Sequence, residues 1–162
     1  MALATFNSLS DSSRVWIYRS DRKLAPNETI QVSKWIEQFI NQWTAHNHTL
    51  KAHGSVYHDR FIVILLDEES SAQASGCSID SQVRFVKDVG ESLKIDFFDR
   101  LHFDFIIDNK VITIHKDEVQ PKISSGDIDK NILVLNHLVK TKSQFINEWS
   151  VPLSESWHQR LI

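Results

Sequence analysis

The sequence contains little cysteine, glycine or proline and no excess of positive charge. Its 162 residues include 1 cysteine, 4 glycines and 3 prolines, and the formal net charge is −3 at pH 7. A single cysteine cannot form a disulfide within the chain, so the sequence does not encode the disulfide framework of a small secreted protein. The scarcity of glycine and proline argues against long irregular linkers.

Extended basic and apolar segments are also missing. Without clustered Lys and Arg, the chain lacks the electrostatic footprint of a nucleic-acid-binding protein. The opening segment, MALATFNSLSDSSR, has neither the basic nor the apolar region of a signal peptide. The longest apolar run, FIVILL (61–66), is far shorter than the ~20 residues of a membrane helix. We therefore expect a cytoplasmic protein with no membrane span and no nucleic-acid partner.

The motifs of common catalytic and nucleotide-binding sites are absent as well. The glycines match neither GxxxxGK[ST] nor GxGxxG, so the sequence contains neither a P-loop nor a dinucleotide-binding motif. It also contains no GxSxG elbow and no HExxH zinc motif. We expect no cofactor and no ATPase activity.

The overall composition is that of a folded protein. Hydrophobic residues make up 41% of the chain and charged residues 24%, values typical of globular domains. A chain of this length buries ~70% of its unfolded surface without needing a metal or a disulfide. Residues 1–13 are small and polar, so we expect a flexible tail there, followed by a single α+β domain over residues 14–162.

Hydrophobic periodicity predicts the order of the elements. We expect a strand at 14–18, a helix within 25–43, a hairpin of strands at 50–57 and 61–66, a second helix within 77–94, and a second hairpin over 100–115. This βαββαβ order is that of the ferredoxin-like fold, with one extra strand. We expect a mainly antiparallel sheet with helices on one face, followed by a short strand (ILVLN) and C-terminal helices around 143–149 and 154–160.

The segment ASGCSID (74–80) contains the only cysteine, at the predicted start of the second helix. A helix N-terminus stabilises a thiolate and offers free backbone N–H groups to an anion. Cys77 is therefore a candidate nucleophile. The segment is also a candidate ligand-binding turn, formed by Ser75, Gly76, Ser78, Asp80 and Arg84.

A purely structural interpretation of the same segment is open. Ser78 is a suitable N-cap, and Asp80 would stabilise the first turn of the helix. Arg84 lies four residues after Asp80, so the two side chains could form a surface ion pair. Cysteine often behaves as a small buried hydrophobic residue.

The second hairpin contains a possible polar cluster. If Asp108 and Asn109 form a two-residue turn, His102 lies opposite His115, and Asp104 shares their face of the sheet. Two histidines and a carboxylate could bind a divalent metal, although an exposed, hydrogen-bonded sheet face is the alternative. The opposite face carries the apolar residues Leu101, Phe103, Phe105, Ile112 and Ile114.

Five tryptophans are many for this length. Trp35 and Trp43 lie on or near the apolar face of the first predicted helix. Trp149 and Trp157 lie near the end of the chain, on either side of Pro152. They could pack over the sheet, or form an exposed aromatic pair that contacts a partner.

Several segments together resemble a known family. FINQWTAHNHTLKA, ASGCSIDSQVRF, FFDR and WSVPLSESWH resemble a family of small Bacteroidetes proteins that often carry an automatic "ABC transporter ATPase" label. The likeness covers most of the chain beyond residue 13, and SGCSID with the closing SWH is its most specific part. It brings no catalytic residues with it, and the Lys-bearing phosphate loop of an ATPase is missing.

Three functional hypotheses follow from the sequence. The first is a non-ATPase domain that binds a small anionic ligand or a protein partner at the SGCSID turn. The second is a cysteine-dependent enzyme with Cys77 as its nucleophile. The third is a structural protein that self-associates through an exposed sheet face or its aromatic C-terminal segment.

Overall fold

The computed structural model describes residues 4–70 and 72–162 as an α+β protein with antiparallel sheets. The chain forms two compact units. Unit 1 contains the residues up to Phe98 together with Lys140–Ser143, and unit 2 contains Asp99–Val139 and Gln144–Ile162. The α+β class with mainly antiparallel sheets is therefore confirmed.

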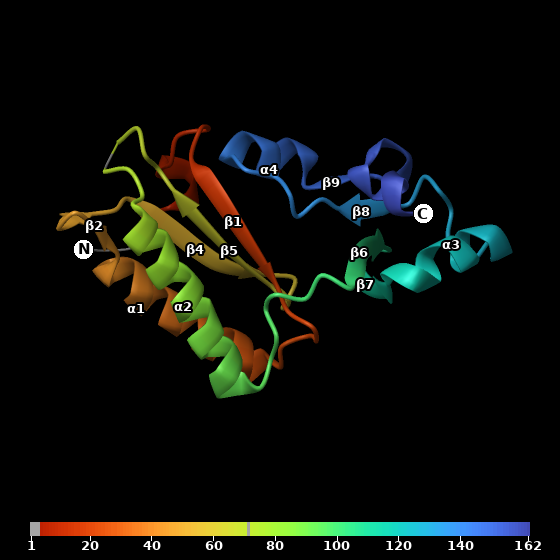
Figure 1. Cartoon of the computed structure of the whole chain (residues 1–162), viewed down its shortest axis with the longest axis horizontal. Helices are drawn as coiled ribbons and strands as arrows, with labels where there is room; N and C mark the ends of the chain where they lie inside the picture. Colours follow the sequence, from red (N-terminus) through yellow and green to blue (C-terminus); the bar gives the residue numbers. More distant parts are fainter. Residues whose placement is uncertain (1–3, 71) are drawn as a thin grey trace. The chain divides into compact units, whose positions relative to one another are not determined.

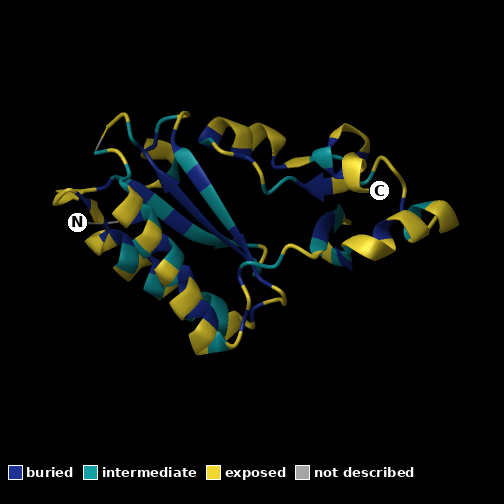
Figure 2. Cartoon of the chain, in the orientation of Figure 1, coloured by how far each residue is buried: buried dark blue, intermediate teal, exposed yellow. Residues whose placement is uncertain are grey.

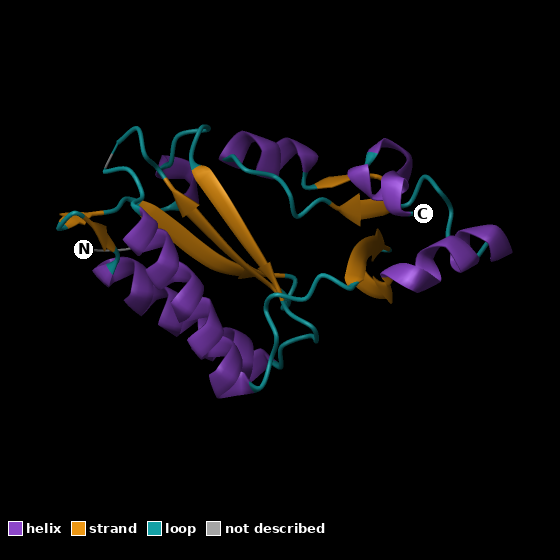
Figure 3. Cartoon of the chain, viewed as in Figure 1, coloured by secondary structure: helices purple, strands orange, loops and turns teal. Residues whose placement is uncertain are grey.

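Unit 1 consists of a three-stranded sheet with two long helices over one face (Figures 1 and 3). The strand order is β1-β5-β4, and both pairs are antiparallel. The elements are η1 (Phe6–Ser8), β1 (Arg14–Arg19), α1 (Pro26–Gln42), β2 (Thr44–Ala45), β3 (His48–Thr49), β4 (Ala52–Tyr57), β5 (Phe61–Leu66) and α2 (Gly76–Leu93).

The central strand β5 forms the middle of the hydrophobic core of unit 1. Every residue of FIVILL is buried, as expected for an apolar run between two other strands (Figure 2). The stripe Val32, Ile36 and Ile40 of α1 packs on the same face of the sheet as Ile62 and Ile64. The apolar residues that helical spacing places on one side of α1 therefore pack against every second residue of β5, in one hydrophobic cluster.

A glycine in β4 allows α1 to lie close to the sheet. A Cβ atom at Gly54 would lie 2.5 Å from Ile36 Cγ2 and 2.8 Å from Ile40 Cδ1. Both distances are too short for a real side chain, so the absence of a side chain at this position sets the helix–sheet spacing.

Unit 2 contains a four-stranded sheet in the order β7-β6-β8-β9. Its core is formed by Phe103, Phe105, Ile114, Val119 and Leu153, with other apolar residues around them. The elements are β6 (His102–Ile107), β7 (Lys110–His115), α3 (Lys116–Ser125), β8 (Leu133–Leu135), α4 (Lys142–Glu148), β9 (Ser150–Pro152), η2 (Leu153–Glu155) and η3 (Trp157–Leu161); the first two residues of α4 belong to unit 1.

The expected ferredoxin-like sheet is not formed. That topology requires the strand after α2 to join the sheet of β1, but β6 pairs with β7 on one edge and with β8 on the other. Both edges of β6 are therefore already hydrogen-bonded within unit 2. On the other side of β1, the Val15 amide donates to the Lys140 carbonyl oxygen at 3.0 Å, and an isolated bridge joins Arg14 to Thr141.

The single domain expected over residues 14–162 stays a prediction. Residues 14–162 form two compact units with separate hydrophobic clusters. Residues 1–3 of the expected tail lie outside the described residues. The remainder of that segment packs on unit 1, where Leu9 is buried and Ser10 binds the Asp67 carboxylate through its amide and its hydroxyl, at 3.0 and 2.9 Å. The Asp67 carboxylate thus holds this polar segment on unit 1 by hydrogen bonds, which the composition of residues 1–13 does not predict.

Candidate functional site

A groove in unit 1 lies between the outward faces of α1 and α2. It consists of two adjoining cavities of about 590 and 900 Å³, which share Phe39, Gln42 and Ser81 in their linings. Because of these shared residues, the two cavities form one continuous groove. We call this feature the α1–α2 groove; the remaining lining residues used below are Trp35, Gln38, Gly76, Cys77, Arg84, Phe85, Asp88 and Ser92.

Helical spacing places these side chains in two rows. On α1 the row contains residues 35, 38, 39 and 42, and on α2 it contains 77, 81, 84, 88 and 92. Spacings of three and four residues keep each row on one side of its helix. The rings of Phe39 and Phe85 stack between the rows, with centroids 4.5 Å apart and planes 6° apart.

One end of the groove is held by Trp43 and the β2–β3 hairpin. The Trp43 indole Nε1 donates to the Ser78 carbonyl oxygen at 2.8 Å, which joins the end of α1 to the start of α2. His46 and Asn47 form the tip of the hairpin, with φ angles of 50° and 65°, and both residues line the groove. His46 is thus the histidine that shares a cavity with Cys77.

The start of α2 differs from the expected cap. Ser75, not Ser78, is the N-cap, and its Oγ accepts a hydrogen bond from the Ser78 amide at 3.1 Å. The Ser78 Oγ accepts in return from the Ser75 amide at 2.7 Å. Ser78 is also buried. The polar groups of these two serines stabilise the helix terminus, which leaves them little capacity to bind an anion.

Cys77 is exposed, and Gly76 beside it has open space in the Cβ direction. Both residues line the groove. Within residues 4–70 and 72–162, no hydrogen bond joins the Cys77 sulfur to His46. The structure therefore makes Cys77 accessible without pairing it to a base.

The expected ion pair between Asp80 and Arg84 is absent from the described residues. Asp80 is exposed and does not line either cavity, so it is not part of the groove. Arg84 is exposed and lines the groove together with Asp88, one turn further along α2. Of the predicted ligand-binding residues, Ser75, Gly76, Ser78 and Arg84 contact the groove.

The histidine hairpin of unit 2 has the predicted register. His102 pairs with His115, Asp104 with Thr113, and Ile107 with Lys110. Asp108 and Asn109 form the turn with φ angles of 50° and 62°. The two imidazole rings lie edge to face, with centroids 5.2 Å apart.

The proposed metal trio of His102, Asp104 and His115 does not form a metal site. Among residues 4–70 and 72–162, no group of three or more His, Cys, Asp or Glu side chains is arranged to hold a metal ion. Asp104 is fully buried and accepts hydrogen bonds from Thr113 Oγ1 at 2.7 Å and His137 Nε2 at 2.9 Å. Its oxygens are directed to these groups rather than to a site shared with the paired histidines.

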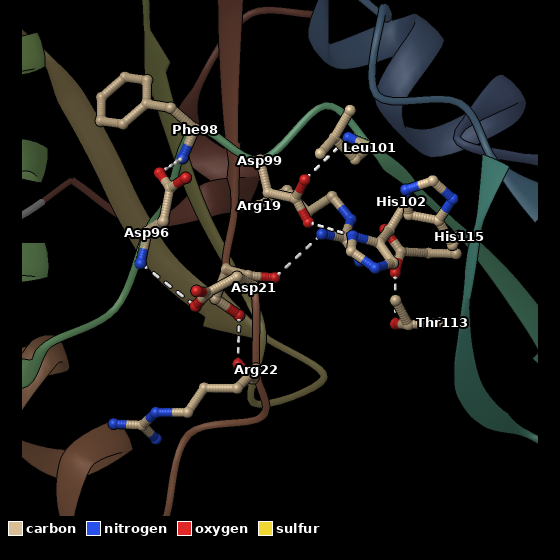
Figure 4. Close-up of polar contacts among 12 residues, drawn as sticks. Arg19, Asp21, Arg22, Asp96, Phe98, Asp99, Leu101, His102, Thr113 and His115 are labelled. Carbon is tan, nitrogen blue, oxygen red and sulfur yellow. Dashed lines mark hydrogen bonds and ion pairs between the residues drawn. The ribbon is translucent and has the colours of Figure 1, made fainter. Parts of the chain in front are cut away.

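Two partners of the cluster are not evident from the sequence. Asp99 accepts a hydrogen bond from His102 Nδ1 at 2.6 Å and another from the Leu101 amide at 2.8 Å (Figure 4). His137 accepts a hydrogen bond from Trp149 Nε1 on its Nδ1, at 3.2 Å, which leaves its Nε2–H to donate to Asp104. These contacts join the cluster members to one another, as in a structural network.

The C-terminal aromatic residues are packed within unit 2. Trp149 is buried, and Trp157 is half-buried with its Nε1 donating to Asn136 Oδ1 at 2.9 Å. His158 is buried between Trp157 and Phe103. Burial and the nearby His137 lower the pKa of His158 to about 4, despite the opposing effect of Asp104.

In the described part of the chain, no helix combines the length and the apolar composition needed to cross a bilayer. Comparisons with protein-family models, curated proteins and solved structures find no match to this chain. The resemblance to the small Bacteroidetes proteins therefore stays a prediction.

Proposed function

We propose that the protein is a non-enzymatic binding protein and that the α1–α2 groove is its binding surface for a protein partner. The observation that carries this proposal is the continuity of the groove, which follows α2 from Cys77 to Ser92. At ~1.5 Å per residue, this stretch is ~22 Å long, more than a compact metabolite requires.

The chemistry of the lining favours a protein partner over a small molecule. Trp35, Phe39 and Phe85 are half-buried aromatic residues, which are common anchors in protein interfaces. Gln38, Gln42 and Arg84 are exposed along the same walls. A pocket for a small ligand usually encloses most of its surface, whereas these exposed walls form an open groove.

We also propose a cytoplasmic location and a partner that is not a nucleic acid. The single cysteine gives no reason to expect an oxidising compartment. The net charge of −3 disfavours a partner with a phosphate backbone.

The aromatic anion 8-anilinonaphthalene-1-sulfonate provides a direct test of the groove. Its rings suit the aromatic floor formed by Phe39 and Phe85, and its sulfonate suits Arg84. We expect its saturable binding to shift the amide NMR signals of α1 and α2, and Arg84→Ala to weaken that binding several-fold. Lys34→Ala, an exposed change on α1 outside the groove, is the matched control. Signal shifts confined to other elements, or equal affinity for both variants, would contradict the proposal.

A second candidate function is a cysteine-dependent enzyme, favoured by the exposure of Cys77 and by His46 in the same cavity. This function requires a thiol that reacts unusually fast at neutral pH. Alkylation by iodoacetamide at pH 7 should then be much faster in the folded chain than in the urea-unfolded chain, and His46→Ala should slow it. Equal rates for the folded and unfolded chains would eliminate the enzyme.

A further inference from the structure

The charges in the α1–α2 groove are arranged so that the groove complements itself. Arg84 and Asp88 are the charged residues of its lining, and they lie four residues apart on the same helix. Neither residue forms an ion pair in the described part of the chain. A partner for this surface must therefore present an anion and a cation separated by ~6 Å, the rise of four helical residues.

A second copy of α2 meets this requirement when it runs antiparallel to the first. A two-fold axis at the height of residue 86 places Arg84 of each copy opposite Asp88 of the other. Two equivalent ion pairs then form, as in an isologous interface. The remaining charged residues of α2 are Asp80, Lys87 and Glu91, and in this register they face Ser92, Phe85 and Ser81. No like charges therefore oppose each other.

The apolar part of the groove fits the same arrangement. Phe85 lies next to the proposed axis, stacked on Phe39 of its own chain. Ser81 and Ser92 are small enough for a second helix to approach closely. A helix also satisfies its own backbone hydrogen bonds, whereas an extended segment would bring unpaired amides against this aromatic floor.

We propose that the α1–α2 groove is a homodimer interface, in which α2 of each copy packs antiparallel to α2 of the other and Arg84 pairs with Asp88 across the axis. This inference rests on the proposed function, since it names the partner of the same groove. A face of roughly 20 by 20 Å on each copy buries on the order of 1,000 Å² in total, near the lower limit for specific complexes. The dimer should accordingly dissociate at low micromolar concentrations.

Charge reversal tests the register of this dimer. We expect sedimentation equilibrium of the full chain to give a monomer–dimer equilibrium. Arg84→Glu alone or Asp88→Lys alone places like charges opposite each other twice per dimer, which should raise the dissociation constant at least ~10-fold. The double variant Arg84→Glu/Asp88→Lys exchanges the charges, restores both pairs and should return the dissociation constant close to the original value.

The control is the pair Lys34→Glu and Glu37→Lys, exposed charge reversals on α1 outside the groove, which should leave the equilibrium unchanged. A monomer at every concentration would overturn the homodimer, as would a dimer that the single variants leave intact or that the double variant fails to restore. A monomer whose groove still binds the aromatic sulfonate would refute the second copy and leave the proposed binding function standing.

Discussion

His102 and His115 lie opposite each other on β6 and β7, with their ring centroids 5.2 Å apart. Their pairing is set by the two-residue turn at Asp108 and Asn109, both of which have positive φ. A turn of this type matches the twist of the flanking strands and thereby fixes the register of the whole hairpin.

The turn can be strengthened. Asn109 has a φ of 62°, a conformation that glycine adopts without strain. We expect Asn109→Gly to raise the free energy of unfolding by ~0.5 kcal/mol in urea titrations. Lys110→Gly, one residue later in the extended strand, should instead lower it, and a gain from both changes would argue against the turn as the cause.

Asp67 joins the N-terminal segment to the end of β5. Its carboxylate accepts hydrogen bonds from the amides and hydroxyls of Ser10 and Ser70 and from the Glu69 amide. Asp67→Ala leaves these donors without their acceptor, so we expect a loss of about 2–4 kcal/mol in the free energy of unfolding. Chemical denaturation measures this loss, and Asp80→Ala on the exposed face of α2 should cost little.

The same carboxylate should make stability depend on acid. Burial raises the pKa of Asp67, but the hydrogen bonds from Ser10 and Ser70 outweigh it and hold that pKa well below the usual range. Stability from a depressed carboxyl pKa is present above the unfolded value of ~3.9 and is lost as the pH falls further. In Asp67→Ala this part of the acid dependence should disappear from thermal melts recorded below pH 4.

His158 should contribute a second, separate pH dependence. Burial lowers its pKa to about 4, so between that pH and ~6.5 the unfolded chain binds a proton that the folded chain does not. Stability should therefore fall by at most about 3 kcal/mol as the pH drops through this window. The variant His158→Gln should have a flatter profile between pH 4 and 6.5, and an unchanged slope would assign the effect to other groups.

Gly54 is expected to tolerate no side chain. A Cβ atom at this position would collide with Ile36 and Ile40 of α1, so Gly54→Ala should lower the free energy of unfolding by about 1–3 kcal/mol. Gly76→Ala is the matched control, because no atom lies within 4 Å of a Cβ at that position. Equal stability of the two variants would show that α1 shifts without cost.

Local elements could be predicted from this sequence, whereas their assembly could not. The register of His102 with His115 follows from turn chemistry and alternation over 14 residues, both of which are visible in the sequence. The sheet that β6 joins depends on its pairing with β8, about 30 residues later, where only Leu133–Leu135 form the strand. Such a short strand carries too little pattern to predict its partner.

Only one wall of the candidate site, the start of α2, could be located from local sequence patterns. ASGCSID correctly indicates a helix start, because serine has a strong preference for the N-cap position, but nothing in these seven residues predicts the groove beside that helix. The opposite wall, formed by Trp35, Gln38, Phe39 and Gln42, comes from a helix about 40 residues earlier. In the sequence, Trp35 and Phe39 belong to the same apolar stripe as the buried residues of α1. Only the tertiary structure shows that these two aromatic residues line the groove, whereas Ile36 and Ile40 lie in the core.

The segment Lys140–Ser143 belongs to unit 1, although the residues on either side of it belong to unit 2. Its backbone hydrogen bonds to Val15 and Ser13 lie within unit 1 and join residues more than 120 positions apart in the sequence. During synthesis, unit 1 therefore lacks part of its contacts until about residue 143 has left the ribosome, by which time most of unit 2 has already been made. The two units should consequently mature together rather than one after the other.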